Sequence, residues 1–150
     1  MRIAALAVLA TLLQLPTTQS RAVVGDRVLG LTRDSAWTLV RSVPIAFRTF
    51  HPQGMVRIGE TFFVSSVEVR KPTQRGPQAD RRHDRDTGEG VGHLFAIDAA
   101  GKLLSDLKLG EGAFYHPGGI DFDGASLWVP VAEYRPNSRS IVYRIDPTGM

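Results

Sequence analysis

The chain contains an internal repeat, which limits the folds that are open to it. The motif His-Pro-x-Gly occurs at His51 and again at His116, an offset of 65 residues. The match continues without a gap, and seven of the twenty positions in 51–70 are identical to their partners in 116–135. Self-similarity at a fixed spacing is typical of proteins that build one structural unit several times. The sequence therefore predicts a repeat architecture.

The repeating unit is shorter than this offset. Residues 94–101 align with 142–149 at an offset of 48, so the first copy carries 17 additional residues between Lys71 and Gly92. Without that insertion the unit has about 48 residues, which is close to the length of one four-stranded propeller blade.

Each unit has the pattern of a series of strands. Short segments rich in Val, Phe, Trp and Tyr suit a pleated sheet, and Gly and Asp residues typical of turns separate them. The expected strands are 55–58, 61–69, 93–98 and 103–109 in the first copy, and 120–122, 126–134 and 141–146 in the second. These strands predict an all-β chain of β-propeller blades, each a four-stranded antiparallel meander. Pro130 cannot donate to a ladder, so a bulge or an early departure from pairing is expected there.

The blade pattern also predicts where the units begin. Residues 37–45 precede His51 as 102–110 precede His116, so 37–45 is expected to be an outer strand. A blade at 51–109 and a partial blade at 116–150 follow. A propeller needs about four to eight blades to close, so we expect an incomplete ring, the N-terminal part of a longer propeller. The alternative is a complete small β-domain, such as a sandwich, with one duplicated motif.

The N-terminus predicts export. Residues 1–22 contain Arg2, an apolar run at 3–15 and a small-residue site near Ala22, which is the organisation of a secretory signal peptide. An uncleaved anchor is the alternative, but the run is short for a transmembrane helix. The protein is therefore expected to be secreted or periplasmic, with no membrane association beyond the signal peptide. The absence of cysteine is compatible with a bacterial exported protein.

The charge pattern argues against nucleic acid as a partner. The net charge is +3, and arginine supplies 15 of the 18 basic residues. These arginines are scattered rather than gathered into a stripe with interleaved aromatic residues. The expected partner is a small molecule or an extracellular protein.

Three residue types that can take part in catalysis or ligand binding, namely His, Glu and Arg, recur in both copies. The His-Pro motif starts the first strand of each unit, and a Glu-x-Arg motif ends the second strand, so the meander brings them to one end of each sheet. His is a general base or metal ligand, Glu a ligand or base, and Arg a clamp for carboxylate or phosphate. The candidate ligand-binding residues are His51, His116, Glu68, Glu133, Arg70 and Arg135. The competing interpretation is structural, with His bonded to backbone and Glu paired with Arg in every blade.

The 17-residue insertion lies at the same end. Long connections without secondary structure are usually binding loops, lids or disordered segments. Residues 83–88 have the acidic alternation of a calcium loop but lack the third acidic position and the closing Glu. A solvated loop is therefore the preferred interpretation.

The blade pattern resembles a known group of proteins. His-Pro-x-Gly, a Phe/Trp-Val second strand and Ile-Asp-x-x-Gly are similar to secreted gluconolactonase-like, NHL-like and YVTN-like propellers. They are most similar to an uncharacterised propeller family known only as a domain of unknown function. The resemblance implies six or seven blades and, from the gluconolactonase-like members, a divalent metal such as calcium in the central channel. The residues themselves identify neither a cofactor nor catalytic residues.

Two functions stay open at this point. One is a binding propeller that takes a ligand at the His/Glu face of the central channel. The other is a metal-dependent lactonase or esterase-like hydrolase at the same place.

Overall fold

The computed structural model describes residues 25–76 and 84–150, and the chain divides into two compact units, 1–40 and 41–150. Within the described part of the first unit, residues 25–29 form a short helix. The predicted signal peptide at 1–22 lies outside the described residues. Every strand that the structure describes belongs to the second unit.

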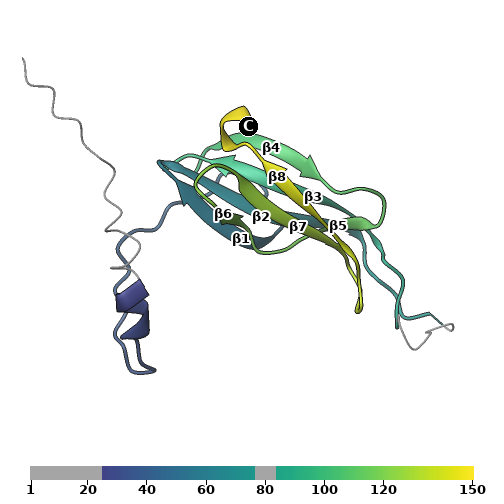
Figure 1. The fold of residues 1–150 in the computed structure, drawn as a ribbon, viewed down its shortest axis with the longest axis horizontal. Helices are drawn as coiled ribbons and strands as arrows, with labels where there is room; N and C mark the ends of the chain where they lie inside the picture. The colour runs from purple at the N-terminus through teal and green to yellow at the C-terminus, as the bar shows by residue number, and fades with distance from the viewer. Residues whose placement is uncertain (1–24, 77–83) are drawn as a thin grey trace, which may run out of the picture. The chain divides into compact units, whose positions relative to one another are not determined.

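Sheet A holds four antiparallel strands that neighbour one another in chain order (Figure 1). They are β1 (His51–Ile58), β2 (Thr61–Lys71), β3 (Glu89–Ile97) and β4 (Leu103–Leu109). The β1–β2 turn contains Gly59 at a φ of 58°, a conformation that glycine adopts without steric cost. Asp98 closes the β3–β4 turn by accepting hydrogen bonds from the N–H groups of Ala100 and Lys102.

Sheet B contains β5 (Phe114–Pro117), β6 (Asp121–Phe122), β7 (Leu127–Glu133) and β8 (Ser140–Ile145), followed by the 3-10 turn η1 (Pro147–Gly149). All pairings are antiparallel. Since β8 pairs with β7 along 127–132, β5 and β6 share the opposite edge of β7. The two short strands are therefore two parts of one interrupted strand.

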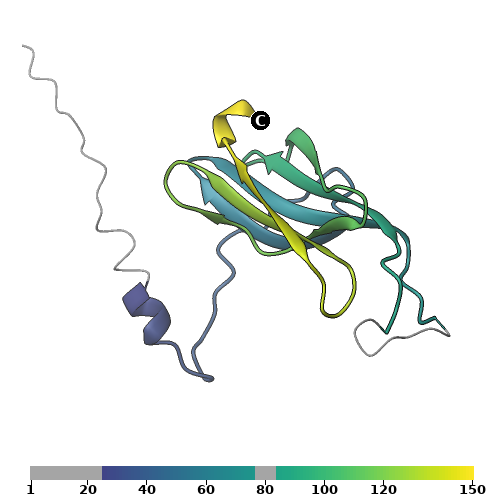
Figure 2. The same cartoon turned by 45° about the vertical axis from the view of Figure 1, so that its right-hand side comes forward.

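The core lies between the two sheets, which face one another in both ribbon views (Figure 2). Alternate side chains of each strand point to opposite faces, and the inward set is apolar. The buried members of this cluster are Phe63, Leu94, Ala96 and Leu109 from sheet A, and Leu127, Val129 and Val131 from sheet B.

The other face of sheet A is covered in part by the segment 41–50. Phe47 meets the ring of Phe95 edge-on at 5.3 Å between centroids, and Phe50 stacks on His93 at 4.7 Å. The hydroxyl of Ser66 donates a hydrogen bond to the carbonyl oxygen of Thr49. This segment therefore packs on the sheet without becoming one of its strands.

One predicted strand is not assigned in the described structure. No strand is assigned to residues 37–45, although the sequence predicts an outer strand there. A strand needs a partner ladder for its backbone groups, and neither described sheet supplies one to this segment. The apolar side chains of its first part remain in solvent, with Trp37 80% and Val40 94% exposed.

The all-β prediction is confirmed, and the other predicted strands are found, β4 with the predicted ends and the rest with shifted ends. Pro130 is accommodated differently from the expectation, because β7 stays in register with β8 through the Pro130–Val142 pair. The interruption falls in the neighbouring strand instead. Gly118 donates its N–H to the carbonyl of Pro130, so the edge on which Pro130 lacks a donor faces the gap between β5 and β6.

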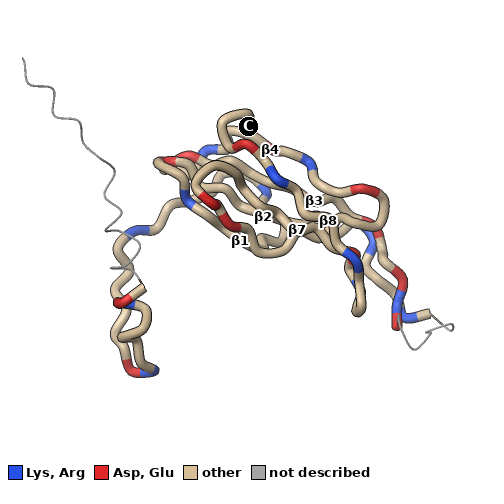
Figure 3. The backbone as a smooth tube through the Cα atoms, in the orientation of Figure 1, with Lys and Arg blue, Asp and Glu red and all other residues tan. Residues whose placement is uncertain are grey.

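Charges are interspersed along the described chain (Figure 3). Among residues 25–76 and 84–150, no helix is long and apolar enough to cross a membrane.

Candidate functional site

The two His-Pro-x-Gly motifs meet where β1 of sheet A passes sheet B. A Cβ placed on Gly54 would lie 2.8 Å from the Cα of Gly119, so the two backbones are in close approach. The hydroxyl of Ser65, on β2, donates a hydrogen bond of 2.7 Å to the carbonyl of Gly118. Small residues at this crossing thus bring the beginning of β1 and the β5–β6 break together.

A polar groove of about 630 Å³ opens beside the first motif. It is lined by residues 47–51 and 67–70, and we call it the His51 groove. Three candidate residues line it, namely His51, Glu68 and Arg70. Arg70 is paired with Glu68 at 3.0 Å, and its side chain is 61% exposed. This pair can therefore open to a ligand at little cost, because exposed ion pairs contribute little.

His116 lies on β5 in a less exposed setting. Its ring stacks on the ring of Tyr134, with 4.3 Å between centroids and an interplanar angle of 22°. Burial lowers the pKa of His116, and the charge of the nearby His51 lowers it further. The structure therefore brings the two histidines near enough to interact, and it favours a neutral imidazole at His116.

Glu133 is placed very differently from its repeat partner Glu68. Its side chain is only 3% exposed and is held by Arg135 at 3.1 Å and by Arg139 at 3.2 Å. Hydrogen bonds from Arg135 and then Arg139 lower the pKa of Glu133 against the opposing effect of burial. Both of its carboxylate oxygens are engaged, so Glu133 and Arg135 form a closed structural pair. The six candidates therefore divide into an accessible set around His51, the less exposed His116, and a locked pair at the end of β7.

The loop between β2 and β3 is tied to sheet B on its described side. The hydroxyl of Tyr115 donates a hydrogen bond to the carbonyl of Thr87, and the Tyr115 ring packs so closely on Gly90, at the start of β3, that a Cβ there would collide with it. The carboxylate of Asp86 accepts from the N–H groups of Gln74 and Gly88. Of the predicted acidic alternation, Asp86 therefore serves the loop backbone, while His83 lies outside the described residues. Among the described residues, no three His, Asp or Glu side chains gather in a group that could hold a metal ion.

Sequence reasoning missed one histidine altogether. His93, on β3, is 1% exposed, and its Nδ1 lies 2.9 Å from Asp106 and 3.0 Å from the Nζ of Lys108. Its Nε2 is buried and has no hydrogen-bond partner among the described residues. Burial opposes ionisation of Asp106, but the hydrogen bonds from Lys108 and His93 outweigh it and lower the pKa of Asp106. The only signal in the sequence was a histidine in an otherwise apolar strand.

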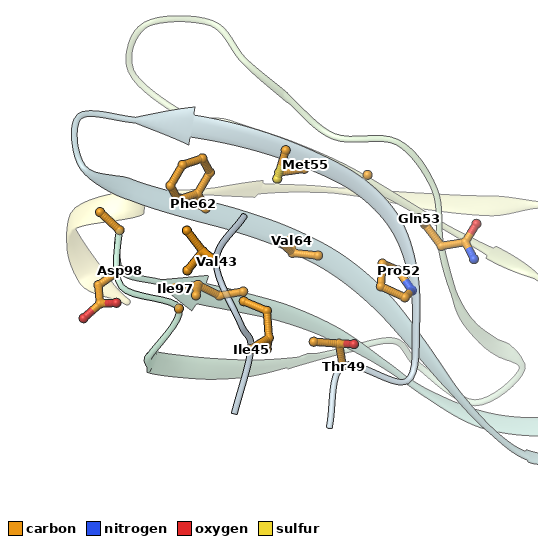
Figure 4. A pocket seen from close by; sticks show the side chains of 13 residues that line it. Val43, Ile45, Thr49, Pro52, Gln53, Met55, Phe62, Val64, Ile97 and Asp98 are labelled. Atoms are coloured by element: carbon orange, nitrogen blue, oxygen red, sulfur yellow. The ribbon is translucent and has the colours of Figure 1, made fainter. Parts of the chain in front are cut away.

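A second groove, of about 560 Å³, lies on the covered face of sheet A. Figure 4 shows its apolar lining, which comes from the segment before β1 and from β1, β2 and the end of β3; the labelled members include Val43, Ile45, Met55, Phe62, Val64 and Ile97. Asp98 at its rim is already engaged in the β3–β4 turn. This groove offers apolar contact rather than chemistry.

Fold and site together define an all-β protein of two facing antiparallel sheets, with a histidine-bearing polar groove at one end of sheet A. The chain belongs to DUF6454, a family of unknown function, whose model matches residues 9–150. No curated protein and no solved structure matches the chain.

Proposed function

We propose that this chain is part of a secreted β-propeller that binds a small molecule or an extracellular partner protein at the end carrying His51 and His116. The observation that carries the proposal is the meeting of the two His-Pro-x-Gly motifs at Gly54 and Gly119, beside an open polar groove. Residues that recur in each repeat and converge at one place can form one shared site.

The way the sheets face one another supports the propeller. Phe63 and Leu94 of sheet A are buried in the contact with sheet B. Their repeat partners, Trp128 and Val142, lie on the face of sheet B that is turned away from sheet A, and they are 38% and 57% exposed. Sheet B therefore presents outward the same kind of face that sheet A presents to sheet B. Stacking of this kind continues from one sheet to the next, as in a propeller.

The ligand site is supported by chemistry at the His51 groove. Its lining combines an exposed imidazole, a carboxylate and the guanidinium groups of Arg48 and Arg70 with the rings of Phe47 and Phe50. A few polar groups beside aromatic surface are typical of small-molecule sites. The Glu68–Arg70 pair contributes one acceptor and one donor to this surface.

Ligand-induced thermal stabilisation tests the proposal. Calcium, zinc, and a panel of neutral and acidic monosaccharides would be added separately to the 150-residue chain and to two variants, His51→Ala and His116→Ala. A bound probe raises the melting temperature by mass action, and both variants should lose that rise. Arg57→Ala is the matched control, because Arg57 is on β1 but pairs with Glu60 at the opposite end of the strand. A response that survives both histidine substitutions would leave the histidines structural.

One observation favours a hydrolase as the second candidate. Burial lowers the pKa of His116 and so favours its neutral imidazole, and a neutral imidazole can act as a general base or bind a metal. A metal-dependent lactonase or esterase would hydrolyse simple lactones or aryl esters, and His116→Ala would abolish that activity. Equal hydrolysis by the variant and the unsubstituted chain would exclude this role for His116.

A further inference from the structure

Phe50 separates the His51 groove from a buried histidine. Its ring lines the groove and stacks on His93 at 4.7 Å with an interplanar angle of 27°. His93 stacks in turn on Phe95 at 5.1 Å. His93 therefore lies directly beneath a side chain that the groove exposes.

The position of Phe50 is held against its backbone preference. Its φ is 55°, in the left-handed region that residues with a bulky side chain rarely adopt. Strain of this kind persists only where the surrounding structure imposes it, and it is concentrated at binding sites and switch regions. Relaxation of the backbone at Phe50 would lift the ring from His93. The ring thus covers His93 from a strained position of the backbone.

The buried imidazole is prepared for one further hydrogen bond. A negative carboxylate favours the tautomer in which Nδ1 donates its N–H to Asp106, while Lys108 neutralises the same carboxylate from the other side. Nε2 then carries a lone pair, buried and unpartnered among the described residues. A buried polar atom without a partner is costly, and in a native protein it calls for an explanation.

The groups around His93 leave Nε2 available to a ligand. On β2, the cross-strand neighbour Ser66 gives its hydroxyl proton to the carbonyl of Thr49. On β4, Asp106 accepts the Nδ1 proton, and Lys108, whose Nζ can only donate and lies 3.0 Å from Nδ1, gives its hydrogen bond to the other oxygen of Asp106. Phe50 and Phe95 both pack against the imidazole ring and supply no acceptor or donor. No described side chain therefore competes for Nε2.

We propose that His93 is a covered ligand-binding residue of the His51 groove, that Phe50 opens and closes it, and that the ligand donates a hydroxyl hydrogen bond to Nε2. This inference rests on the proposed binding function for the identity of the groove. The cover and the tautomer are properties of the chain without ligand, so they are measured independently.

Acylation by diethyl pyrocarbonate, located by peptide mass spectrometry, tests the cover. The reagent transfers an ethoxycarbonyl group to an unprotonated imidazole nitrogen and releases ethanol and carbon dioxide. In the unsubstituted 150-residue chain, His51 should react at least about tenfold faster than His93, because His93 must wait for local opening. Phe50→Ala should raise the His93 rate about tenfold while leaving the rates of His51 and His116 unchanged. Phe47→Ala is the matched control, because its ring contacts Phe95 and not His93.

Two results would overturn the role of Phe50 as a cover. In one, His93 reacts as fast as His51 in the unsubstituted chain. In the other, His93 stays protected from acylation in Phe50→Ala. If Phe50→Ala unfolds the chain, the acylation rate of His116 rises as well. Hydrogen exchange on the unsubstituted chain then tests the cover. If opening at Phe50 admits the reagent, the backbone amide of the adjacent His51 must exchange with solvent at least as fast as His93 is acylated. Acylation that is only as fast as exchange at the core amide of Leu94 would mean global unfolding and would refute the gate.

Nitrogen-15 NMR tests the tautomer. The chemical shift of Nε2 should be that of a nitrogen without a proton, and a protonated Nε2 would refute a hydroxyl donor as the ligand group. The two proposals fail separately. If the groove binds no ligand, Phe50→Ala should still raise the acylation rate of His93. If Phe50 does not cover His93, the effects of His51→Ala and His116→Ala on ligand-induced stabilisation still hold.

Discussion

Glu133 and Glu68 occupy equivalent positions in the repeat, but their carboxylates differ in burial and in the number of arginines bonded to them. Glu133 is buried and bonded by two arginines, whereas Glu68 is 25% exposed and bonded by Arg70 alone. Glu133→Gln would leave Arg135 and Arg139 without their counter-charge. We expect it to reduce the free energy of unfolding by about 1–3 kcal/mol at pH 7, and Glu68→Gln to reduce it by less than about 1 kcal/mol.

The pH dependence gives this prediction a sign. The folded-state pKa of Glu133 is lowered, so its contribution is present above the pKa of the unfolded chain and is lost as the pH falls through the folded value. Urea unfolding at pH 7 and near pH 3 would measure both variants. The difference between Glu133→Gln and the unsubstituted chain should shrink toward pH 3. A difference that is the same at both pH values would contradict an ionic role for Glu133.

The sequence predicted candidate site residues only where they recur in both copies of the repeat. His51, Glu68 and Arg70 stand out because each recurs 65 residues later, and the structure places all three at one groove. His93 has no such partner. Its importance comes from Asp106 on the next strand and from Phe50 above it. Contacts of that kind depend on register and on the path of the chain before β1, which no local pattern in the sequence specifies.

The crossing of β1 and sheet B depends on one glycine. In Gly54→Ala the new Cβ would lie 2.8 Å from two backbone atoms, the Cα of Gly119 and the N of Ile120. Backbone cannot rotate away as a side chain can, so the sheets must separate locally. Overpacking of this kind costs about 1–3 kcal/mol, which denaturant unfolding would show as a lower midpoint.

The same motif supplies the matched control for this prediction. A Cβ on Gly119 would meet no atom within 4 Å, so Gly119→Ala should change the free energy of unfolding by less than about 0.5 kcal/mol. Equal destabilisation by the two alanines would mean that glycine is needed for backbone freedom at both positions rather than for the close approach of the sheets.

The strands themselves were largely predictable, because composition and turn residues mark them locally. β4 was predicted with the observed ends, and β2 and β7 within two residues. β1 begins earlier than predicted, at His51, because pairing with Val67 extends it through the His-Pro motif. The segment 37–45 has the composition of a strand but no partner in the described sheets. Composition shows that a segment is able to form a strand, but a strand forms only where a partner strand is available to pair with it.

At the scale of the whole molecule, the two sheets have faces of the same kind in different surroundings. The inward face of sheet A is covered by sheet B, and its central residues Phe63 and Leu94 are 3% and 0% exposed. The equivalent outward face of sheet B carries Trp128 and Val142, at 38% and 57% exposure. Exposed apolar patches often mark interaction surfaces, and under the propeller proposal this face is where the next sheet would stack.

The propeller proposal therefore predicts that this 150-residue chain self-associates through the outer face of sheet B. Burying one large apolar side chain contributes about 1.5–3 kcal/mol, and each 1.4 kcal/mol corresponds to about a tenfold change in the dissociation constant. The double variant Trp128→Gln/Val142→Thr should thus weaken association at least about tenfold, as measured by sedimentation velocity over a range of concentrations. Leu104→Thr is the matched control, because Leu104 is 54% exposed but lies on β4, outside this face. If the chain is monomeric throughout, or if Leu104→Thr weakens association equally, the outer face of sheet B is not a stacking surface and the propeller loses its main support.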